Sequence, residues 1–314
     1  MLGNSVDYGV VLELDMIDKG IIMDLIRNCR VSYETLARRY NLAANSIKTR
    51  IEKLLESGVI QRFNVELSLA MIDAELMLAL ISTEGLVNEE AFTEKIANNP
   101  VVLQVGFLPS SICVVFAEYI GSQGLSDLGL FFRGLDRVKE VEIHTLLVER
   151  GGKAELTKLK LKVLRCLTQD ARMPVSEIAE RTGLTARRVR KVLDQFLDDE
   201  VVRFTLRADY NAGEDTAFLA IIHWNQKNAK HGDVVEWLQT EFPKELSHFF
   251  ISASEPTVFG MFVVEHLRKA EGIARRMRGV SFIESVEVLT LYPARKSPGL
   301  REGLLERMLT EAGL

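Results

Sequence analysis

Residues 184–197, LTARRVRKVLDQFL, and residues 42–55, LAANSIKTRIEKLL, place apolar side chains at matching positions when they are aligned at an offset of 142. The aligned pairs are Leu42 with Leu184, Ile47 with Val189, Ile51 with Leu193, Leu54 with Phe196 and Leu55 with Leu197. In the later stretch the apolar residues recur at intervals of three and four, which is the spacing of one helix face. The chain therefore carries the same amphipathic helix twice.

Each of these helices follows two other helical segments. In the first unit, an apolar repeat at residues 17–26 leads into SYETLARRYNL, where Ser32 is placed to cap a short helix. The third helix ends at Gly58, because glycine accepts the left-handed backbone of a helix end, and VIQRFNVEL then alternates as a strand does. The second unit repeats this plan, with Gly183 at its bend and VVRFTL as its strand. Three short helices and a closing strand predict a winged helix-turn-helix in each unit.

The net charge of −5 conceals two basic segments. Residues 14–65 carry nine Lys or Arg against six Asp or Glu, and residues 156–207 carry twelve against seven. A local basic surface is what meets phosphate groups, so these segments are predicted to bind double-stranded DNA. The alternative is a helix face that is charged only to stay solvated.

The predicted DNA-binding residues lie on the side of each third helix opposite its apolar stripe. In the second unit they are Arg187, Arg188, Arg190 and Lys191, with Thr185 placed to cap the helix. In the first unit they are Asn45, Ser46, Lys48, Thr49 and Lys53. Short polar groups can hydrogen-bond to base edges, whereas clustered cations favour phosphates. We therefore expect base recognition from the first helix and backbone contacts from the second.

About 85–105 residues of different character follow each unit. Both stretches have the order β-α-β-β-α-β, which is a ferredoxin-like split βαβ unit, so the fold class is α+β. Gly151 and Gly152 mark the junction between the halves. The predicted domains are a winged helix-turn-helix at 1–65, a ferredoxin-like sensor domain at 66–150, a second winged helix-turn-helix at 151–208, and a second sensor domain with a C-terminal helix at 209–314.

Several other classes of function are disfavoured. The sequence contains no run of 18 apolar residues and no secretory signal. The cysteines, Cys29, Cys113 and Cys166, are too far apart in sequence for a disulfide framework or a CxxC metal site. We therefore expect a cytoplasmic protein. There is no Gly-rich phosphate loop with a Lys and no nucleophile signature. We therefore expect no catalytic residue, no metal and no cofactor, and hence no enzyme. The histidines, which are also scattered, are His144, His223, His231, His248 and His266.

The first unit resembles the Lrp/AsnC family of transcription regulators. The similarity is clearest at SIKTRIEKLLESGVI, residues 46–60, which includes Arg50 and ends on the family's Gly-Val-Ile transition into the strand. The resemblance implies a DNA-binding helix-turn-helix, to which Arg50 also contributes, followed by a sensor domain that forms dimers. The second unit departs from the pattern, with Val192 at the position of Arg50 and Glu200 at the position of Gly58.

The sensor domains depart from the family at the turn between their second and third strands. The family usually carries a Gly-x-Tyr-Asp-like turn there, whereas this chain has FLPSSIC and SASEPTVFG, which lack that Asp. We therefore expect common amino acids to bind weakly. A small-molecule effector, where there is one, is expected at the interface between the sensor domains, near residues 106–113 and 252–260.

Two alternatives to a regulator remain. Siroheme decarboxylases of the alternative heme pathway are built from paired proteins similar to this family, and a tandem chain could be a fusion of such a pair. His144, His223 and His248 would then be candidates for a tetrapyrrole pocket. The third possibility is a dimerisation scaffold with vestigial helix-turn-helix units.

The duplication itself predicts how the halves are arranged. A four-stranded sheet with an apolar face needs a partner to cover it, and the chain contains two such sheets, with runs such as LMLALI and FLAIIHW. We expect the two sensor domains to pack together within one chain as a pseudo-dimer. A fused pair can carry two different recognition helices, which implies an asymmetric DNA site. Association of whole chains into a further homodimer is also expected.

Overall fold

The computed structural model describes residues 14–86, 88–108, 111–209, 212, 215–290 and 294–314. Residues 1–13 of the first predicted domain, and Pro109 and Ser110 of the predicted effector region, lie outside the described residues. Within the described ranges, none of the helices combines the length and the apolar character that a membrane span requires. The three cysteines are buried free thiols.

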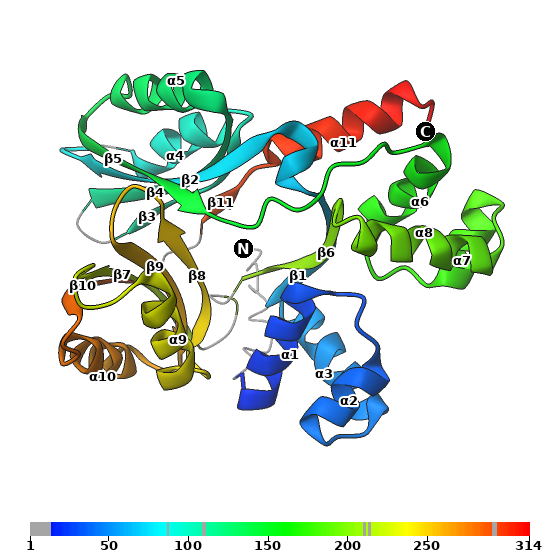
Figure 1. The fold of residues 1–314 in the computed structure, drawn as a ribbon, viewed down its shortest axis with the longest axis horizontal. Coiled ribbons are helices and arrows are strands. Elements are labelled where there is room, and N and C mark those ends of the chain that lie inside the picture. The colour runs from blue at the N-terminus through cyan, green and yellow to red at the C-terminus, as the bar shows by residue number, and fades with distance from the viewer. Residues whose placement is uncertain (1–13, 87, 109–110, 210–211, 213–214, 291–293) are drawn as a thin grey trace, which may run out of the picture.

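Both winged helix-turn-helix units have the predicted order of elements (Figure 1). The first comprises α1 (Met16–Arg27), α2 (Tyr33–Tyr40), α3 (Ala44–Glu56) and β1 (Ile60–Leu67); the second comprises α6 (Lys158–Gln169), α7 (Val175–Thr182), α8 (Ala186–Asp198) and β6 (Val202–Ala208). Ser32 caps α2 and Thr185 caps α8, as predicted. Gly58 has a φ of 77°, and Glu200 adopts the same left-handed backbone, with a φ of 52°, although it is not glycine.

The two units are joined through their strands, since β1 pairs with β6 in an antiparallel two-stranded sheet. Asn64 lies opposite Thr205 in this pairing. Beyond the irregularity between Ile60 and Arg62 the offset of the repeats becomes 141, because Arg62-Phe63-Asn64 aligns with Arg203-Phe204-Thr205, so Asn64 and Thr205 are equivalent positions. This pair of residues therefore marks a pseudo-two-fold axis between the halves. Each unit contributes one strand to this sheet, so the strand of each unit pairs with the strand of the other unit.

The sensor domains have the predicted β-α-β-β-α-β order. The first comprises β2 (Ala74–Thr83), α4 (Glu89–Ala97), β3 (Val102–Leu108), β4 (Ile112–Ile120), α5 (Gly121–Arg133) and β5 (Val138–Leu147), preceded by the 3₁₀ helix η1 (Leu69–Ile72); the second comprises β7 (Thr216–Trp224), α9 (His231–Glu241), β8 (Leu246–Ser252), β9 (Thr257–Val264), α10 (Leu267–Arg278) and β10 (Ile283–Thr290). The strand orders β5-β2-β4-β3 and β10-β7-β9-β8 are equivalent, and all neighbouring strands are antiparallel.

The two sheets face each other across an apolar layer within the one chain, as the duplication predicts. Leu78 and Val114 of the first sheet belong to one buried cluster with Leu219 and Phe259 of the second. The sheets are also joined at an edge, because β5 pairs with β8. Helices α4 and α5 cover the outer face of one sheet, and α9 and α10 cover the outer face of the other (Figure 1).

The C-terminal segment corrects the predicted domain division. The sequence places residues 209–314 in one domain, but β11 (Arg295–Lys296) pairs with β3 of the first sensor domain, and α11 (Gly299–Glu311) packs against α6, β1 and the first sheet. Glu118 of β4 fixes the helix, because its buried carboxylate accepts the backbone N–H groups of Leu300 (2.7 Å) and Arg301 (3.1 Å) and pairs with the Arg301 guanidinium. Residues 295–314 thus belong structurally to the first half and the second helix-turn-helix.

Candidate nucleic-acid interface

Helix α8 separates an apolar face from a cationic one. Val189, Val192 and Phe196 are buried in the core of the second unit. The opposite face exposes four cations, and no described residue forms an ion pair with any of them; they are Arg187, Arg188, Arg190 and Lys191. Thr185 accepts the backbone N–H of Arg188 (3.2 Å) at the start of the helix. A helix N-terminus surrounded by exposed cations is suited to phosphate oxygens.

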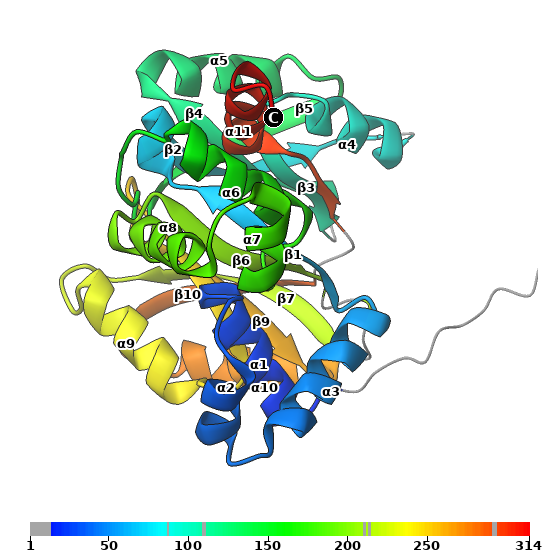
Figure 2. The same cartoon turned by 90° about the vertical axis from the view of Figure 1, so that its right-hand side faces the viewer.

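Helix α3 presents a different surface. Its outward side chains are Asn45, Ser46, Lys48, Thr49 and Lys53, and all five are exposed. Ala43 precedes the helix and provides no side-chain cap, so the first-turn N–H groups face outward without a side-chain acceptor. Several of these residues line a shallow cavity of about 530 Å³ beside the start of α1. The residues predicted for each helix lie on its exposed side. Helices α3 and α8 themselves belong to separate units (Figures 1 and 2).

Arg50 is placed differently from the other predicted DNA-binding residues. Its guanidinium pairs with Asp15 and Asp18 at the start of α1, each at 2.8 Å, and the hydrogen bond with Asp18 raises the pKa of Arg50. Burial in turn raises the pKa of Asp18. Arg50 therefore holds α3 against α1. Sequence analysis missed this role, although Asp15 and Asp18 are spaced as a capping box, which they form.

The second unit lacks this ion pair. Val192, at the position of Arg50, is buried, so α8 is held on its unit by apolar contacts. Near the end of α8, Lys160 of α6 instead pairs with Asp199 at 3.2 Å. The two recognition helices thus differ both in the face that they expose and in the contacts that orient them.

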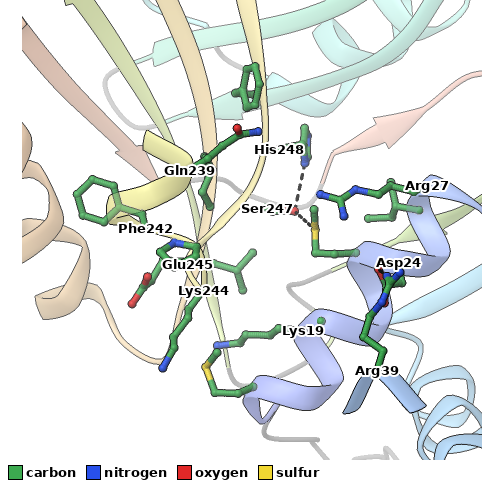
Figure 3. Close-up of a pocket in the computed structure, with 18 of the residues that line it drawn as sticks. Lys19, Asp24, Arg27, Arg39, Gln239, Phe242, Lys244, Glu245, Ser247 and His248 are labelled. Atoms are coloured by element: carbon green, nitrogen blue, oxygen red, sulfur yellow. Dashed lines mark hydrogen bonds and ion pairs between the residues drawn. The ribbon is translucent and has the colours of Figure 1, made fainter. Parts of the chain in front are cut away.

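A cavity of about 770 Å³ lies between α1 and the second sensor domain (Figure 3). Its walls come from α1, the end of α2, the end of α9 and β8. Lys19 anchors one side by pairing with Asp215 at 3.1 Å, and Met23 contacts Ser247 (3.6 Å from Sδ to Oγ). The lining reaches Phe249 and Val263, on either side of the predicted effector residues 252–260, but includes no residue of 106–113 or 252–260, and that prediction stays untested.

The three histidines considered for a tetrapyrrole have separate partners. His144 contacts Ser252 and Glu142, and His223 contacts Thr257. Only His248 lines the cavity, where the surrounding protein displaces water from its imidazole and lowers its pKa to about 4. The imidazole of His248 is therefore neutral at pH 7.

One group of side chains has the composition of a metal site. Ligand atoms of Glu142, His144 and Glu255 lie within 4.8 Å of one another. However, the Nε2 atom of His144 lies 2.7 Å from Glu142 and its Nδ1 atom lies 3.1 Å from Ser252. Both ring nitrogens are thus engaged by the protein, and a metal ion would have to displace one of these partners.

Comparison with known proteins places the chain in a family. The family described as winged helix-turn-helix DNA-binding matches it twice, at residues 14–61 and 156–203. An HTH-type transcriptional regulator of Pyrococcus abyssi is 32% identical over 139 residues, which are 43% of this chain and 92% of the relative.

Among solved structures, the siroheme decarboxylase NirDL has a TM-score of 0.55 at 16% identity, covering 95% of this chain and 98% of that chain. AsnC of Escherichia coli has a TM-score of 0.36 at 17% identity, covering 46% of this chain and 100% of that chain. Less than half of this chain covers nearly the whole length of the relative from Pyrococcus abyssi. The chain belongs to the family of winged helix-turn-helix DNA-binding proteins that includes these HTH-type transcriptional regulators, and it carries the winged helix-turn-helix twice.

Proposed function

We propose that the chain regulates transcription by binding an asymmetric site on double-stranded DNA with both of its recognition helices. The observation that carries this proposal is the cluster of exposed cations on α8, which no described residue pairs with. An unpaired cationic face on the third helix of a helix-turn-helix is complementary to the phosphate backbone. The polar face of α3 supports a second contact, made to base edges.

The difference between the helices assigns them different roles. Arg187, Arg188, Arg190 and Lys191 provide contacts with phosphates, which strengthen binding to every sequence. Asn45, Ser46 and Thr49 carry the short donors and acceptors that discriminate between bases. Because the two faces differ, the preferred site is not palindromic.

A salt series measured by fluorescence anisotropy tests the proposal. The dissociation constant for duplex DNA is measured for the parent and for a variant with Arg187, Arg188, Arg190 and Lys191 changed to Ala. We expect weaker binding to all sequences. The slope of log affinity against log salt should flatten by about 0.9 for each phosphate group that the variant no longer neutralises.

A matched variant separates this effect from a change in net charge. Lys139, Lys227, Arg268 and Arg275 are also exposed, and no described residue forms an ion pair with any of them. Changing these four to Ala removes the same charge from other surfaces. The proposal is wrong if the α8 variant keeps the salt slope of the parent, or if the slope flattens equally in both variants.

A second candidate function rests on the shared fold of the whole chain with the siroheme decarboxylase NirDL. A related activity would require a bound tetrapyrrole, and His248 beside the large cavity is the residue best placed to approach one. Tetrapyrroles absorb strongly in visible light. An absorbance band in the purified protein, or one that appears on adding an iron tetrapyrrole and is absent in His248→Ala, would support the enzyme over the regulator.

Whole chains are also proposed to associate through the outer edges of the double sheet. Sedimentation velocity at several concentrations tests this, since a single species with the mass of one chain would exclude it.

A further inference from the structure

The pseudo-two-fold axis relates two clefts, one of which is occupied by the C-terminal helix of the chain while the other is open. Each cleft lies between the first helix of one helix-turn-helix unit and the sensor sheet of the other half. The closed cleft lies between α6 and β3–β4, where α11 occupies it and leaves a cavity of about 210 Å³. The open cleft lies between α1 and β8–β9, and it is the cavity of about 770 Å³ (Figure 3).

The strand registers establish that the clefts are equivalent. Val102 pairs with Ala117 and Gln104 with Phe116 across an irregularity in β3. Leu246 pairs with Phe262 and His248 with Met261 across the same irregularity in β8. Gln104 therefore corresponds to His248. Counting along β4 and β9 from these pairs, Glu118, which anchors α11, corresponds to Val263, which lines the open cleft.

The closed cleft shows what kind of group fits this type of site. Helix α11 buries Leu305 and Leu309 against the core of the second unit. Its acidic side chains meet cations on the cleft walls: Glu302 pairs with Arg207 at 3.0 Å and Glu306 approaches Arg165 at 3.8 Å. The occupant of the closed cleft thus combines an apolar body with carboxylates, besides the Arg301 guanidinium that pairs with Glu118, a carboxylate that the open cleft replaces with Val263.

The open cleft also combines apolar and cationic walls, but its cations stand at other positions, since Met23 occupies the position of Arg165. Met16, Met23, Ile26, Phe242 and Leu246 provide apolar surface. Its cations include Arg27 and Lys244, which are exposed and form no ion pair with any described residue. Figure 3 shows Arg27 directed from the end of α1 toward Ser247 and His248.

We propose that the open cleft binds a small molecule that combines an apolar body with a carboxylate, that Arg27 recognises the carboxylate, and that Lys244, on the opposite side of the cleft, adds positive charge (Figure 3). A volume of about 770 Å³ suits such a ligand, because ligand sites typically measure about 300–1,000 Å³. The regulatory part of this proposal rests on the proposed function.

A ligand in this cleft touches the element that orients α3. Met23 and Arg27 lie on α1, and Asp15 and Asp18 at the start of the same helix hold Arg50 of α3. The other wall belongs to the second sensor domain, to which Lys19 already ties α1 through Asp215. A bound ligand therefore changes the contact between α1 and the sensor domain, and with it the placement of the first recognition helix.

The fluorescent fatty acid cis-parinaric acid and its methyl ester are suitable probes, because they share one apolar chain and differ in the carboxylate. We expect the acid to bind the full-length protein at one site per chain, about tenfold tighter than the ester. In the double variant R27Q/K244Q the affinity for the acid falls to that for the ester, whose own affinity is unchanged. The control R268Q/K227Q, which removes exposed cations elsewhere, binds both probes as the parent does.

A second variant tests the location of the site. Met23→Trp projects a larger side chain into the cleft and should weaken binding of both probes about tenfold or more while the far-ultraviolet circular dichroism stays native. The proposed site is overturned if the acid and the ester bind equally, or if R27Q/K244Q binds the acid as the parent does.

The regulatory step is measured separately, as the change in DNA affinity when the acid is added to the parent and to Met23→Trp. A change of at least threefold in the parent alone is the expected result. If the acid binds the cleft but DNA affinity does not respond, the coupling is overturned. If the protein does not bind DNA at all, the proposed function fails, and the probe titrations still decide the site.

Discussion

Arg30 and Arg172, which stand 142 residues apart, each donate hydrogen bonds to the loop that carries the other. The Nη1 atom of Arg30 donates to the carbonyls of Ala171 (2.6 Å) and Met173 (3.1 Å). Arg172 in turn donates hydrogen bonds to the carbonyls of Cys29 and Val31. The two helix-turn-helix units are thus tied together by a reciprocal contact of the kind that normally joins two identical chains.

Changing Arg30 or Arg172 to Gln should destabilise the junction between the units. Each substitution leaves two carbonyls without their charged donor, so we expect a decrease of about 1–3 kcal/mol in the free energy of unfolding. Because the contacts are pseudo-symmetric, the two decreases should be similar. Urea unfolding measures both, with Lys139→Gln as an exposed control. A decrease in one variant only would show that one of the two arginines is dispensable for the junction.

Glu118→Gln should release the C-terminal helix. The substitution removes the nearer of the two carboxylates that pair with Arg301, leaving Glu66 at 3.6 Å, and it removes the negative charge at the start of α11. Losing this charged acceptor costs about 1–3 kcal/mol. Hydrogen exchange should accelerate in residues 299–311 before it does in the sheets. Unchanged protection of that helix would contradict the anchoring role of Glu118.

Arg50→Gln should act on stability more than on base preference. Arg50 links α3 to Asp15 and Asp18, so its removal should lower the free energy of unfolding by about 1–3 kcal/mol. Asn45→Ala together with Thr49→Ala should instead leave stability almost unchanged and relax the sequence preference at the bases that these residues contact. Selection of bound sequences from a random pool separates the two effects. A relaxed preference in Arg50→Gln, with stability unchanged, would place Arg50 on the DNA.

The stability of the protein should depend on pH through His248. Its pKa is about 4 when folded, against 6.5 ordinarily, so the unfolded chain binds the proton more readily between these values. Stability contributed by the neutral ring is present above pH 6.5 and is lost as pH falls toward 4, at up to about 1.4 kcal/mol per pH unit. His248→Gln should flatten the pH profile of unfolding in that window. The exposed His231→Gln provides the control, and identical profiles for parent and His248→Gln would refute the assignment.

Local patterns are sufficient to predict the elements and their order. Ser32 and Thr185 cap helices because each side chain accepts a backbone N–H only three residues further along the chain. The alternation of apolar residues along each strand likewise predicts which side of that strand is buried. The pairing of the two sensor sheets also follows, since two uncovered apolar faces in one chain have each other as partners.

Contacts between distant residues are not predictable in the same way. The position of α11 depends on Glu118, which precedes Arg301 by 183 residues. A single acidic residue in the otherwise apolar strand ICVVFAEYI is the available signal. The family resemblance implies that Arg50 contributes to DNA binding, and it does not reveal the acidic partners that a neighbouring helix brings to Arg50.

The pairing of β1 with β6 has a consequence for how binding responds to the amount of protein. In a regulator assembled from separate subunits, dilution first dissociates the dimer, and occupancy of a two-helix site then falls with the square of the monomer concentration. Here both recognition helices are connected by peptide bonds, so their local concentration is fixed by the fold. Below saturation, occupancy of a DNA site by one chain is therefore first order in protein, and a few molecules per cell respond in proportion to their number.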